Sequence, residues 1–421
     1  MGQRESTDPP TRLFSETTRA TMDNSGYGSW RSISDPDAIS LSFGFPFPAS
    51  FPNDELVTAA EALFDAEGDR ALQYSGGEYA SRLPAIVAER ARDRGIDCRD
   101  EQVLLTNGAT HAIDVVCRTF LDPNDLLFVE APTFLGALSL FRNHGVEIEG
   151  FELDSNGLDV EALAEDLEAS RREGRKLPKM VYTIPDFQNP TGVTLSPERR
   201  ERLLELAAEY EFVVLEDDAY GELRYHGEDV PSIKALDESG LVVRAGTFSK
   251  TIAPGIRTGW IIAHETFTEQ MRRINAGGTN AFTQGIVGYY CAEGLLEENV
   301  VELREAYSDL CDHMLACLTE YMPLEVDWSD PDGGFFVWIT LPERVDAEAI
   351  LPDAVEQGVT YLPGQLFYPD DRGHNCLRLS FSHVSRDETE RGIEALAATI
   401  RSAASNDRTV SDRSVSSASD R

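Results

Sequence analysis

Lysine is scarce in this chain of 421 residues. Only four lysines occur, at positions 176, 179, 234 and 250, and arginine supplies the other 33 of the 37 basic side chains. The 74 acidic side chains leave a formal net charge of −37. Such a negative field repels nucleic acid and anionic membranes, so we expect neither as a partner. Because the acids are spread along the whole chain, the composition is typical of a halophile's surface, whose self-repulsion is screened by salt.

The chain also lacks the patterns that disulfide and metal sites require. Its six cysteines and seven histidines are scattered, without a C-x-x-C pair or metal-ligand spacing, so we expect reduced thiols and no metal. No run of about 18 apolar residues occurs, and the N-terminus has no signal-peptide core, so we expect a cytoplasmic protein. No G-x-G-x-x-G motif follows the first predicted strand, which argues against a dinucleotide-binding enzyme.

The spacing of apolar runs predicts an α/β protein. From Gln102 onward, short β runs alternate with helical stretches, which is typical of a largely parallel sheet with helices on both faces. Helices are expected at 54–67, at 196–210 with Ser196 as N-cap, and over 281–322. The seven predicted strands span 102–106, 125–131, 146–153, 179–185, 212–217, 241–248 and 259–263.

A chain of this length exceeds one ordinary domain. We expect an N-terminal arm and small-domain segment over residues 1–50, a large domain over 51–310 and a smaller α+β domain over 311–403. The small domain has two β segments, 334–340 and 376–381, and a helix near 346–357. Residues 404–421 are rich in Ser, Asp and Arg, and we predict a disordered tail there.

The stretch Gly246–Trp260 carries the chemistry around which we expect the chain to be organised. The apolar run 241–243 leads to a turn with Ser249 and Lys250, and Arg257 stands seven residues after the lysine. A lysine whose pKa is lowered by desolvation and nearby cations can form a Schiff base with a carbonyl cofactor, which arginine cannot do. Arg257 suggests a phosphate clamp beside this amine. The structural alternative is a lysine that only caps a strand end.

Further polar groups follow other predicted strands, and the carboxyl ends of strands in an open α/β sheet bind ligands. The turn 108–110 precedes an apolar helix, where backbone N–H groups bind phosphate, although a plain turn also fits. The segment 189–192, Asn-Pro-Thr-Gly, could equally be only a β-turn. Asp217 ends a buried strand, so its carboxylate needs a partner, either the ring nitrogen of a cofactor or an arginine.

Together these motifs resemble those of the fold-type I, pyridoxal-phosphate-dependent aminotransferases of classes I and II. The combination of Ser-Lys-x-x-x-Pro-Gly-x-Arg-x-Gly with Asn-Pro-Thr-Gly and Asp-x-Ala-Tyr is highly specific. Segments 44–46, 73–77 and 376–381 are most similar to the branch that contains 2-aminoadipate and kynurenine aminotransferases. The resemblance covers roughly residues 39 to 400. It implies a seven-stranded, mostly parallel sheet with helices on both faces and a smaller α+β domain.

The resemblance implies how pyridoxal phosphate is held. Lys250 forms the Schiff base and later moves a proton between the substrate Cα and the cofactor C4′. Asp217 keeps the pyridine nitrogen protonated, so that the ring acts as an electron sink. Phe134 stacks on the ring, at a position where many relatives have tyrosine. The remaining cofactor ligands are Tyr220 and Asn189 at the phenolic oxygen, and Ser249, Arg257, Gly108, Ala109 and Thr110 at the phosphate.

The resemblance also implies substrate and subunit contacts. Arg378 binds the α-carboxylate of an amino acid or 2-oxo acid with both guanidinium nitrogens, although a surface arginine on an edge strand is the structural alternative. Gly44 lets the backbone approach the substrate, which Asn189 also contacts. Tyr74 lies in a turn-rich segment and reaches the cofactor phosphate of a neighbouring chain, which makes the protein a homodimer. A tyrosine at the rim of its own domain is the alternative.

The reaction that the resemblance implies is transfer of an amino group between an L-amino acid and a 2-oxo acid in ping-pong half-reactions. A carbon–sulfur lyase or a decarboxylase would use the same catalytic residues. A transcription regulator with this fold carries a fused N-terminal winged helix, for which residues 1–35 are too short. Relatives often have Ser-Gln or Gln-Gln where this chain has Ala109-Thr110-His111, and the N-terminal arm matches them poorly. The sequence therefore does not identify the amino donor.

Overall fold

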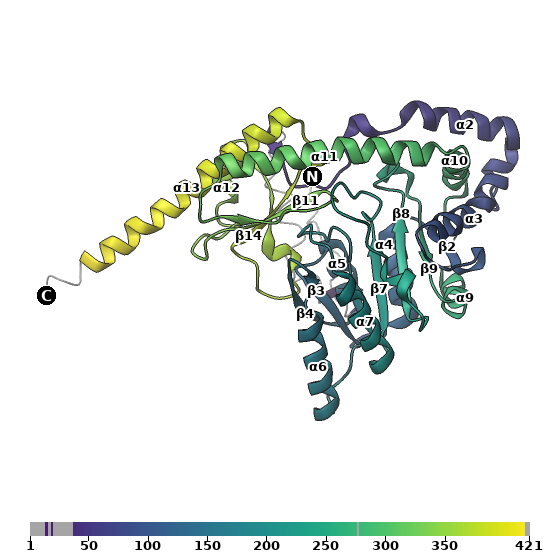
Figure 1. The fold of residues 1–421 in the computed structure, drawn as a ribbon, viewed down its shortest axis with the longest axis horizontal. Coiled ribbons are helices and arrows are strands. Elements are labelled where there is room, and N and C mark those ends of the chain that lie inside the picture. Colours follow the sequence, from purple (N-terminus) through teal and green to yellow (C-terminus); the bar gives the residue numbers. More distant parts are fainter. Residues whose placement is uncertain (1–12, 16–17, 20–36, 276–277, 417–421) are drawn as a thin grey trace, which may run out of the picture.

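The computed structural model describes residues 13–15, 18–19, 37–275 and 278–416, so most of the predicted N-terminal arm lies outside the described residues. A large α/β domain stands beside a smaller α+β domain, and the long helix α11 (Leu295–Tyr321) runs across both of them (Figure 1). The two sheets meet near the middle of the molecule, where segments far apart in sequence come together.

An eight-stranded sheet forms the centre of the large domain, in the order β2-β9-β8-β7-β6-β3-β4-β5. The pairs from β8 to β4 are parallel, whereas β9 is antiparallel to both neighbours and β5 is antiparallel to β4. Seven strands match the predicted ones. The eighth, β5, has two residues and gives no sequence pattern. The bounds are β2 Val103–Thr106, β3 Leu126–Ala131, β4 Glu147–Asp154, β5 Gly157–Leu158, β6 Met180–Thr183, β7 Val213–Asp218, β8 Val242–Thr247 and β9 Gly259–Ile262.

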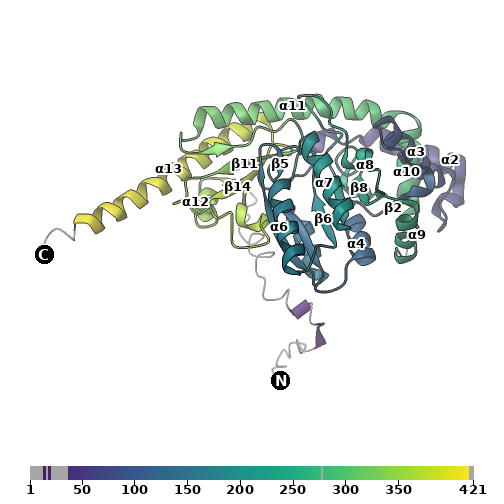
Figure 2. The same ribbon diagram turned by 60° about the horizontal axis from the view of Figure 1, so that its bottom comes forward.

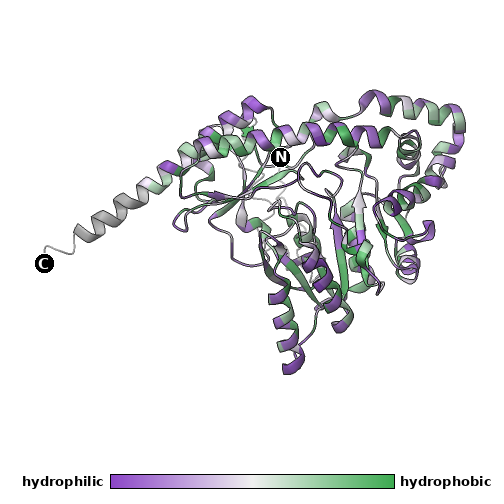
Figure 3. Ribbon diagram, viewed as in Figure 1, coloured by the Kyte–Doolittle hydropathy of each residue, from purple (hydrophilic) through white to green (hydrophobic). Residues whose placement is uncertain are grey.

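Helices cover both faces of this sheet, as predicted (Figure 2). Helices α4, α5 and α9 pack on one face, and α6, α7, α3 and α10 pack on the other. Apolar residues concentrate on the strands and on the sides of the helices that face them (Figure 3). The α-helices are α2 Asn53–Glu67, α3 Glu78–Asp93, α4 Ala109–Phe120, α5 Leu135–Asn143, α6 Val160–Glu173, α7 Pro197–Tyr210, α8 Ile233–Leu236, α9 Glu265–Ile274 and α10 Ala281–Ala292.

Local sequence signals account for several helix ends. Ser196 caps α7 as predicted, because its side chain accepts a hydrogen bond from the backbone N–H of Arg199. Asp159 caps α6 in the same way, through the N–H of Ala162. Short 3-10 helices connect other elements of residues 37–416, at η4 Pro48–Ser50, η5 Gly68–Leu72, η6 Asp100–Gln102, η7 Pro254–Ile256 and η8 Gly364–Phe367.

The smaller domain contains a four-stranded antiparallel sheet in the order β10-β11-β14-β13. The first strand of the described chain, β1, pairs in parallel with β12, which joins the segment after the arm to this domain. The predicted helix near 346–357 is shorter than expected and begins at Leu351. The bounds are β1 Ile39–Ser40, β10 Asp327–Trp328, β11 Phe336–Thr340, α12 Leu351–Glu356, β12 Val359–Thr360, β13 Leu362–Pro363, β14 Cys376–Ser380 and α13 Arg386–Ser416.

The C-terminal helix runs into the tail expected over residues 404–421, of which 417–421 lie outside the described residues. Helix α13 continues to Ser416 and extends away from the body in Figure 1. Its first part packs into the small-domain core through Ile393, Leu396 and Ile400. An established helix adds further turns without a new nucleation cost, which composition alone does not reveal.

Helix α11 contributes to three separate apolar clusters. Leu296 and Val300 pack with α3 and α10, Tyr307 packs with aromatic residues beside the central cavity, and Cys311 lies in the small-domain core. The helix therefore ties both domains to the region between them.

Candidate active site

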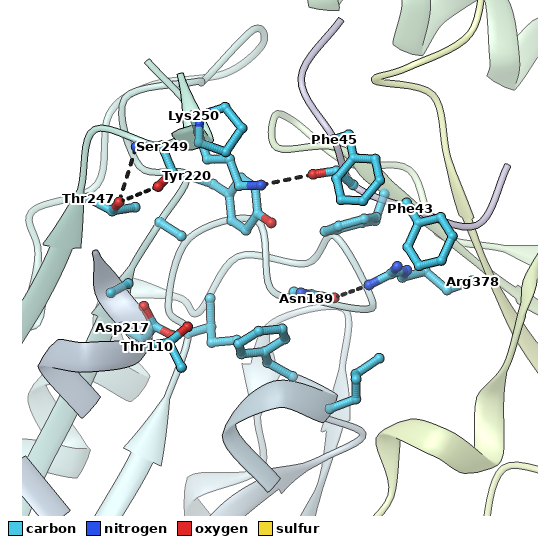
Figure 4. Close-up of a pocket in the computed structure, with 18 of the residues that line it drawn as sticks. Phe43, Phe45, Thr110, Asn189, Asp217, Tyr220, Thr247, Ser249, Lys250 and Arg378 are labelled. Atoms are coloured by element: carbon cyan, nitrogen blue, oxygen red, sulfur yellow. Dashed lines mark hydrogen bonds between the residues drawn. The ribbon is translucent and has the colours of Figure 1, made fainter. Parts of the chain in front are cut away.

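A cavity of about 330 Å³ lies between the two domains, at the carboxyl ends of the parallel strands (Figure 4). Its walls come from the large sheet, from the segment after β1 and from β13 and β14 of the small domain. This is the edge at which open α/β sheets bind ligands. Eleven of the residues predicted for the site line this one cavity: Gly44, Ala109, Thr110, Phe134, Asn189, Asp217, Tyr220, Ser249, Lys250, Arg257 and Arg378.

Lys250 follows β8 and its amine points into the cavity, where Nζ donates a 2.8 Å hydrogen bond to the carbonyl oxygen of Gly44. Burial, together with the positive charges of Arg378 and Arg257, lowers the pKa of this amine from its ordinary 10.5 to about 8. A lowered pKa increases the neutral, nucleophilic fraction at neutral pH. Lys250 can therefore attack a carbonyl group.

The segment 42–46 crosses the cavity and offers backbone carbonyl groups to it. The Ser42 carbonyl accepts a 2.6 Å hydrogen bond from Arg378 Nη2, and the Phe45 carbonyl accepts one of 2.8 Å from the Ser382 hydroxyl. At Gly44 a Cβ atom would overlap the ring of Phe336, so glycine is required for this close approach. Because Gly44 has no side chain, the Phe336 ring can pack against its backbone, and the Gly44 carbonyl can reach Lys250.

Asp217 is buried at the end of β7, and its two carboxylate oxygens differ. Oδ2 accepts a 2.7 Å hydrogen bond from the Tyr182 hydroxyl, whereas Oδ1 is buried without a hydrogen-bond partner. Burial raises the pKa of Asp217 from 3.8 to about 6, the Tyr182 bond opposes that rise, and the charge of Asp218 adds to it. Within the described chain no arginine pairs with Asp217, because Arg244 pairs with Asp218 instead. A ring nitrogen that carries a proton would satisfy Oδ1.

The part of the cavity wall formed by the start of α4 and by Arg257 is suited to binding an anion. Helix α4 begins at Ala109, so its first backbone N–H groups and its positive dipole end lie at the cavity wall. Arg257 lies beside it, with Nη2 2.9 Å from the Asn107 carbonyl oxygen and Nη1 3.5 Å from the Ser249 hydroxyl. Gly108 has a φ of 85°, and a Cβ there would overlap the Arg257 guanidinium. Among the described residues Arg257 forms no ion pair with an acid, so a phosphate fits here.

Arg378 is a buried cation on β14 without a carboxylate partner among the described residues. Its Nη1 donates a 2.7 Å hydrogen bond to Asn189 Oδ1, and Nε has no partner (Figure 4). The guanidinium lies over the ring of Phe336, 4.0 Å from its centroid. Burial lowers the pKa of Arg378 to about 9. Because an unpaired buried charge is costly, the site calls for a carboxylate ligand.

Two aromatic residues and one surface tyrosine complete the predicted set. Tyr220 is buried, and its ring packs edge-on against Phe335 and Phe336 at 5.4 and 5.8 Å. Phe134 stands at the N-terminus of α5 and lines the cavity. Tyr74 is fully exposed and is not among the residues that line this cavity. In one chain it therefore stays apart from the other predicted residues.

Sequence reasoning missed two groups of residues at this site. The first is apolar: Phe43 and Phe45 stack with ring centroids 5.1 Å apart and line the cavity with Leu135, Ile184 and Leu362. Such side chains carry no signal that separates them from core residues. The second group lies beneath the cavity, around Glu130, where one acid within the apolar run of β3 was a signal that could have been used.

Glu130 is a buried carboxylate that organises the turn carrying Asn189. It accepts hydrogen bonds from the Thr183 hydroxyl, the Ile184 N–H and Gln188 Nε2. The Gln188 side-chain oxygen in turn accepts from the Thr191 N–H and hydroxyl. Burial raises the pKa of Glu130 from 4.5 to about 7. This network holds the turn at both ends and so positions the amide of Asn189.

A metal site, a membrane span and a disulfide each have requirements that the described residues do not meet. In the described residues, no group of three or more His, Cys, Asp or Glu side chains could hold a metal ion. None of the helices in that part of the chain is long and apolar enough to cross a membrane. The six cysteines are buried and form no disulfide.

The fold and the cavity together define an α/β enzyme with a reactive lysine, a phosphate-binding end and an arginine for an acid substrate. The family model for aminotransferases of class I and II matches residues 40–396. Aromatic-amino-acid aminotransferase 1 of Thermococcus litoralis is 41% identical over 369 residues, which are 87% of this chain and 88% of that protein. The 2-aminoadipate transaminase of Thermus thermophilus is 35% identical over 372 residues, or 87% and 91% of the two chains. The crystal structure of Pyrococcus horikoshii kynurenine aminotransferase, in complex with PMP, matches with a TM-score of 0.86 at 37% identity, over 93% of this chain and 97% of that one.

The chain belongs to the class I and II aminotransferases. It is a transaminase that moves an amino group between an L-amino acid and a 2-oxo acid, and its cofactor is pyridoxal phosphate. The predicted family, fold type, reaction and cofactor are thereby confirmed. The residues present fit this cofactor: in the described part of the chain, Asp217 Oδ1 lacks a hydrogen-bond partner and Arg257 lacks an acidic one, and the pKa of the Lys250 amine is lowered.

Proposed function

We propose that this aminotransferase acts on aromatic and other large apolar amino acids. The observation that carries the proposal is the composition of the cavity wall, in which Phe43, Phe45 and Leu362 offer apolar surface beside Arg378. The cationic side chains among the lining residues are Lys250, Arg257 and Arg378, and each has a role at the cofactor or the α-carboxylate. The described lining residues therefore include no further cation that could pair with a side-chain carboxylate of the substrate. The aromatic amino acid named for the Thermococcus relative agrees with this choice.

The proposed roles follow from the contacts of each side chain. When bound, pyridoxal phosphate withdraws electrons from the Cα of the amino acid attached to it. Lys250 would supply the neutral amine that holds the cofactor and, once released, would take the proton from the substrate Cα and deliver it to the cofactor C4′. Asp217 accepts a hydrogen bond from the ring nitrogen through Oδ1. Arg257, Ser249 and the turn Gly108–Thr110 bind the phosphate.

The remaining residues orient the substrate and the ring. Arg378 binds the α-carboxylate, and its bond to Asn189 fixes the direction of the guanidinium. Because Asn189 Oδ1 already accepts from Arg378, its Nδ2 is available to donate to the phenolic oxygen of the cofactor, as is the Tyr220 hydroxyl. Phe134 contributes an apolar surface for the ring. The neighbouring Gly44 keeps the backbone close to Lys250.

The experiment that tests this proposal measures one half-reaction at a time. The holoenzyme is mixed with single amino acids, and conversion of the cofactor to its amine form is followed by absorbance. We expect phenylalanine, tyrosine, tryptophan and leucine to react with a higher second-order rate constant than aspartate or 2-aminoadipate. Lys250→Ala is the control, because no other lysine lines the cavity to form a borohydride-trapped adduct. Faster reaction with the dicarboxylic donors would contradict the proposed specificity, whereas a trapped adduct on Lys250→Ala would contradict the role of Lys250.

We also propose that the protein is a homodimer in which Tyr74 serves the neighbouring active site. Tyr74 is fully exposed and follows the exposed Leu72 by two residues. Val57, Phe64 and Leu72 on the adjacent α2 and η5 are also exposed, by 59%, 44% and 64%. A second copy of the chain would cover this apolar surface in an isologous interface.

Mixing two inactive variants tests this arrangement. Tyr74→Phe removes one hydrogen bond to a charged phosphate, worth about 1.5–3 kcal/mol, and should lower cofactor affinity at least about tenfold. Lys250→Ala removes the reactive amine. In a hybrid dimer, one site keeps Lys250 and receives Tyr74 from the other chain, so activity should recover after subunit exchange. Failure to recover after exchange is demonstrated would assign Tyr74 to its own chain's site or to none.

Three further proposals concern the setting of the enzyme. We infer a cytoplasmic location from the six buried cysteines, which form no disulfide. A halophilic surface is supported by the net charge of −37. We propose a division into a segment 1–50, a large domain 51–310, a small domain 311–403 and a tail 404–421, and the pairing of β1 with β12 supports the assignment of the first segment to the small domain.

A further inference from the structure

Tyr182 lies directly behind Asp217, on the side of the carboxylate away from the cavity. Its hydroxyl is 2.7 Å from Asp217 Oδ2, and the whole side chain is excluded from solvent. It belongs to none of the motifs and does not line the cavity. In the sequence it is one residue of the buried strand β6, and the pattern there gives no sign of a function for its hydroxyl.

The position of this hydroxyl is determined by the sheet and by packing. Tyr182 pairs with Val129 of β3 and with Leu215 of β7, two residues before Asp217. Residues two apart on a strand share a face, so Tyr182 and Asp217 point to the same side of the sheet. The Tyr182 ring packs edge-on against Phe141, with centroids 5.2 Å apart. The phenol therefore has little freedom to turn away from the carboxylate.

The charged form of Asp217 depends on this contact. Its neighbours include further acidic groups, Asp218 and Glu130, and within the described chain no cation pairs with it. Burial raises the pKa of the Tyr182 phenol well above its ordinary value, and the charges of Asp217 and Glu130 act in the same direction. The hydroxyl therefore stays protonated and donates to Asp217. Among the described residues, it is the one side-chain hydrogen bond that the Asp217 carboxylate accepts.

We propose that Tyr182 is a positioning residue for the cofactor: by donating to Oδ2 it holds the Asp217 carboxylate with Oδ1 directed at the pyridine nitrogen. The bond occupies one oxygen and leaves the other, which has no partner in the structure, as the acceptor for the ring N–H. It also favours the ionised carboxylate that a protonated ring requires. Tyr182 acts through Asp217 and does not touch the cofactor. This inference rests on the role of Asp217 proposed above.

Two forms of the cofactor isolate this effect. The first is pyridoxal phosphate, and the second is its analogue in which C–H replaces the ring nitrogen. The ratio of their dissociation constants, measured by equilibrium titration of the apoprotein, reports the contact between Asp217 and the ring nitrogen. For the wild type we expect pyridoxal phosphate to bind about tenfold to a hundredfold tighter than the analogue. Tyr182→Phe should reduce this preference about tenfold while leaving affinity for the analogue nearly unchanged.

Two controls separate positioning from general stability. Tyr361→Phe removes another buried phenol, whose hydroxyl donates to the Ala347 carbonyl at 2.6 Å in the small domain, and should leave the ratio at the wild-type value. In an Asp217→Asn background, Tyr182→Phe should no longer change the ratio, because the carboxylate through which it acts is absent. If Tyr182→Phe lowers the affinity for both cofactor forms equally, or changes the ratio in the Asp217→Asn background, the inference is overturned.

The remaining outcomes are also decisive. A wild-type ratio near one would reject the role of Asp217 and this inference with it. A ratio that collapses in Asp217→Asn but not in Tyr182→Phe would reject the role of Tyr182 alone. If Tyr182→Phe does not fold, the double variant Tyr182→Phe/Asp217→Asn decides. Its recovery of folding shows that the ionised carboxylate needs the phenol, and its failure assigns Tyr182 to the core only.

Discussion

Arg378 Nη1 lies 2.7 Å from Asn189 Oδ1, and this hydrogen bond joins the antiparallel sheet of the small domain to the turn after β6 of the large one. The guanidinium is buried and has no acidic partner in the described chain, while the Ser42 carbonyl accepts from its Nη2 at 2.6 Å. The cation is thus oriented by neutral oxygens from two other segments. A substrate carboxylate would supply the charge that these contacts lack.

Arg378→Ala should weaken amino acids and 2-oxo acids alike, since both present an α-carboxylate. The expected loss in binding is about 2–5 kcal/mol if the pair is desolvated. Arg378→Lys is the matched variant: it keeps the charge but loses the planar fork, and we expect a smaller loss. Steady-state kinetics with each substrate, together with cofactor absorbance, measure both effects. Wild-type kinetics in Arg378→Ala would show that this arginine does not contact the substrate.

The pH dependence of cofactor attachment should report the pKa of Lys250. The folded-state pKa is lowered to about 8, so the reactive neutral amine becomes dominant above that pH rather than above 10.5. The rate constant for attachment to the apoprotein should therefore rise with pH and level off above about 8. In Arg378→Ala one of the cations that lower the pKa is gone, so the midpoint should move to higher pH. Stopped-flow absorbance measures the profile. A midpoint near 10.5 in the wild type would contradict the burial of this amine.

Glu130 should make the apoprotein less stable as the pH rises. Its folded-state pKa is raised from 4.5 to about 7, so the folded chain binds more protons than the unfolded chain between these values. Its contribution is therefore fully present below pH 4.5 and is lost as the pH passes through about 7. Relative to Glu130→Gln, the free energy of unfolding of the wild type should fall by roughly 3 kcal/mol over this range.

Urea unfolding at a series of pH values measures this difference. Glu101→Gln is the control, because Glu101 is exposed and should give a curve parallel to the wild type. Parallel curves for Glu130→Gln and the wild type would mean that Glu130 does not titrate in this range.

Salt should stabilise the protein. The net charge of −37 produces self-repulsion, and the screening length shortens to about 3 Å at 1 M ionic strength. The melting midpoint should rise from low to molar sodium chloride, and potassium chloride should act in the same direction if screening is the cause. Calorimetry across both salt series measures it. A flat or falling midpoint would remove the basis for a halophilic surface.

The sequence predicted most of the large sheet, because its strands are runs of apolar residues separated by turn residues and helices. It also predicted Lys250, Asp217 and Arg257, since each stands in a short motif at a strand end. The contacts of Gly44 and Ser42 could not be predicted, because a backbone carbonyl oxygen carries no residue signature. Tyr182 was missed for a different reason: a tyrosine in a buried strand has the same pattern whether or not its hydroxyl has a function.

Two other differences come from tertiary context. Strand β5 exists because Gly157 and Leu158 pair with the end of β4, and two residues are too few to show a period. Helix α13 continues from residue 404 to Ser416 because its first part packs in the small domain and each further turn needs no new nucleation. Composition describes the segment alone and says nothing about the packed turns that precede it.

Helix α11 constrains how the active site can open. It is 27 residues long, and no loop interrupts it between Val300, which packs with the large domain, and Cys311, which packs in the small one. A rotation of the small domain about this junction has to bend the helix or shift its side chains within a cluster, since no hinge residue lies between them. Tyr307, midway along this stretch, accepts a hydrogen bond of 3.1 Å from the N–H of Phe47, beside the segment that crosses the cavity. Closure of the two domains, which changes the shape of the cavity, is therefore coupled to bending of this one helix.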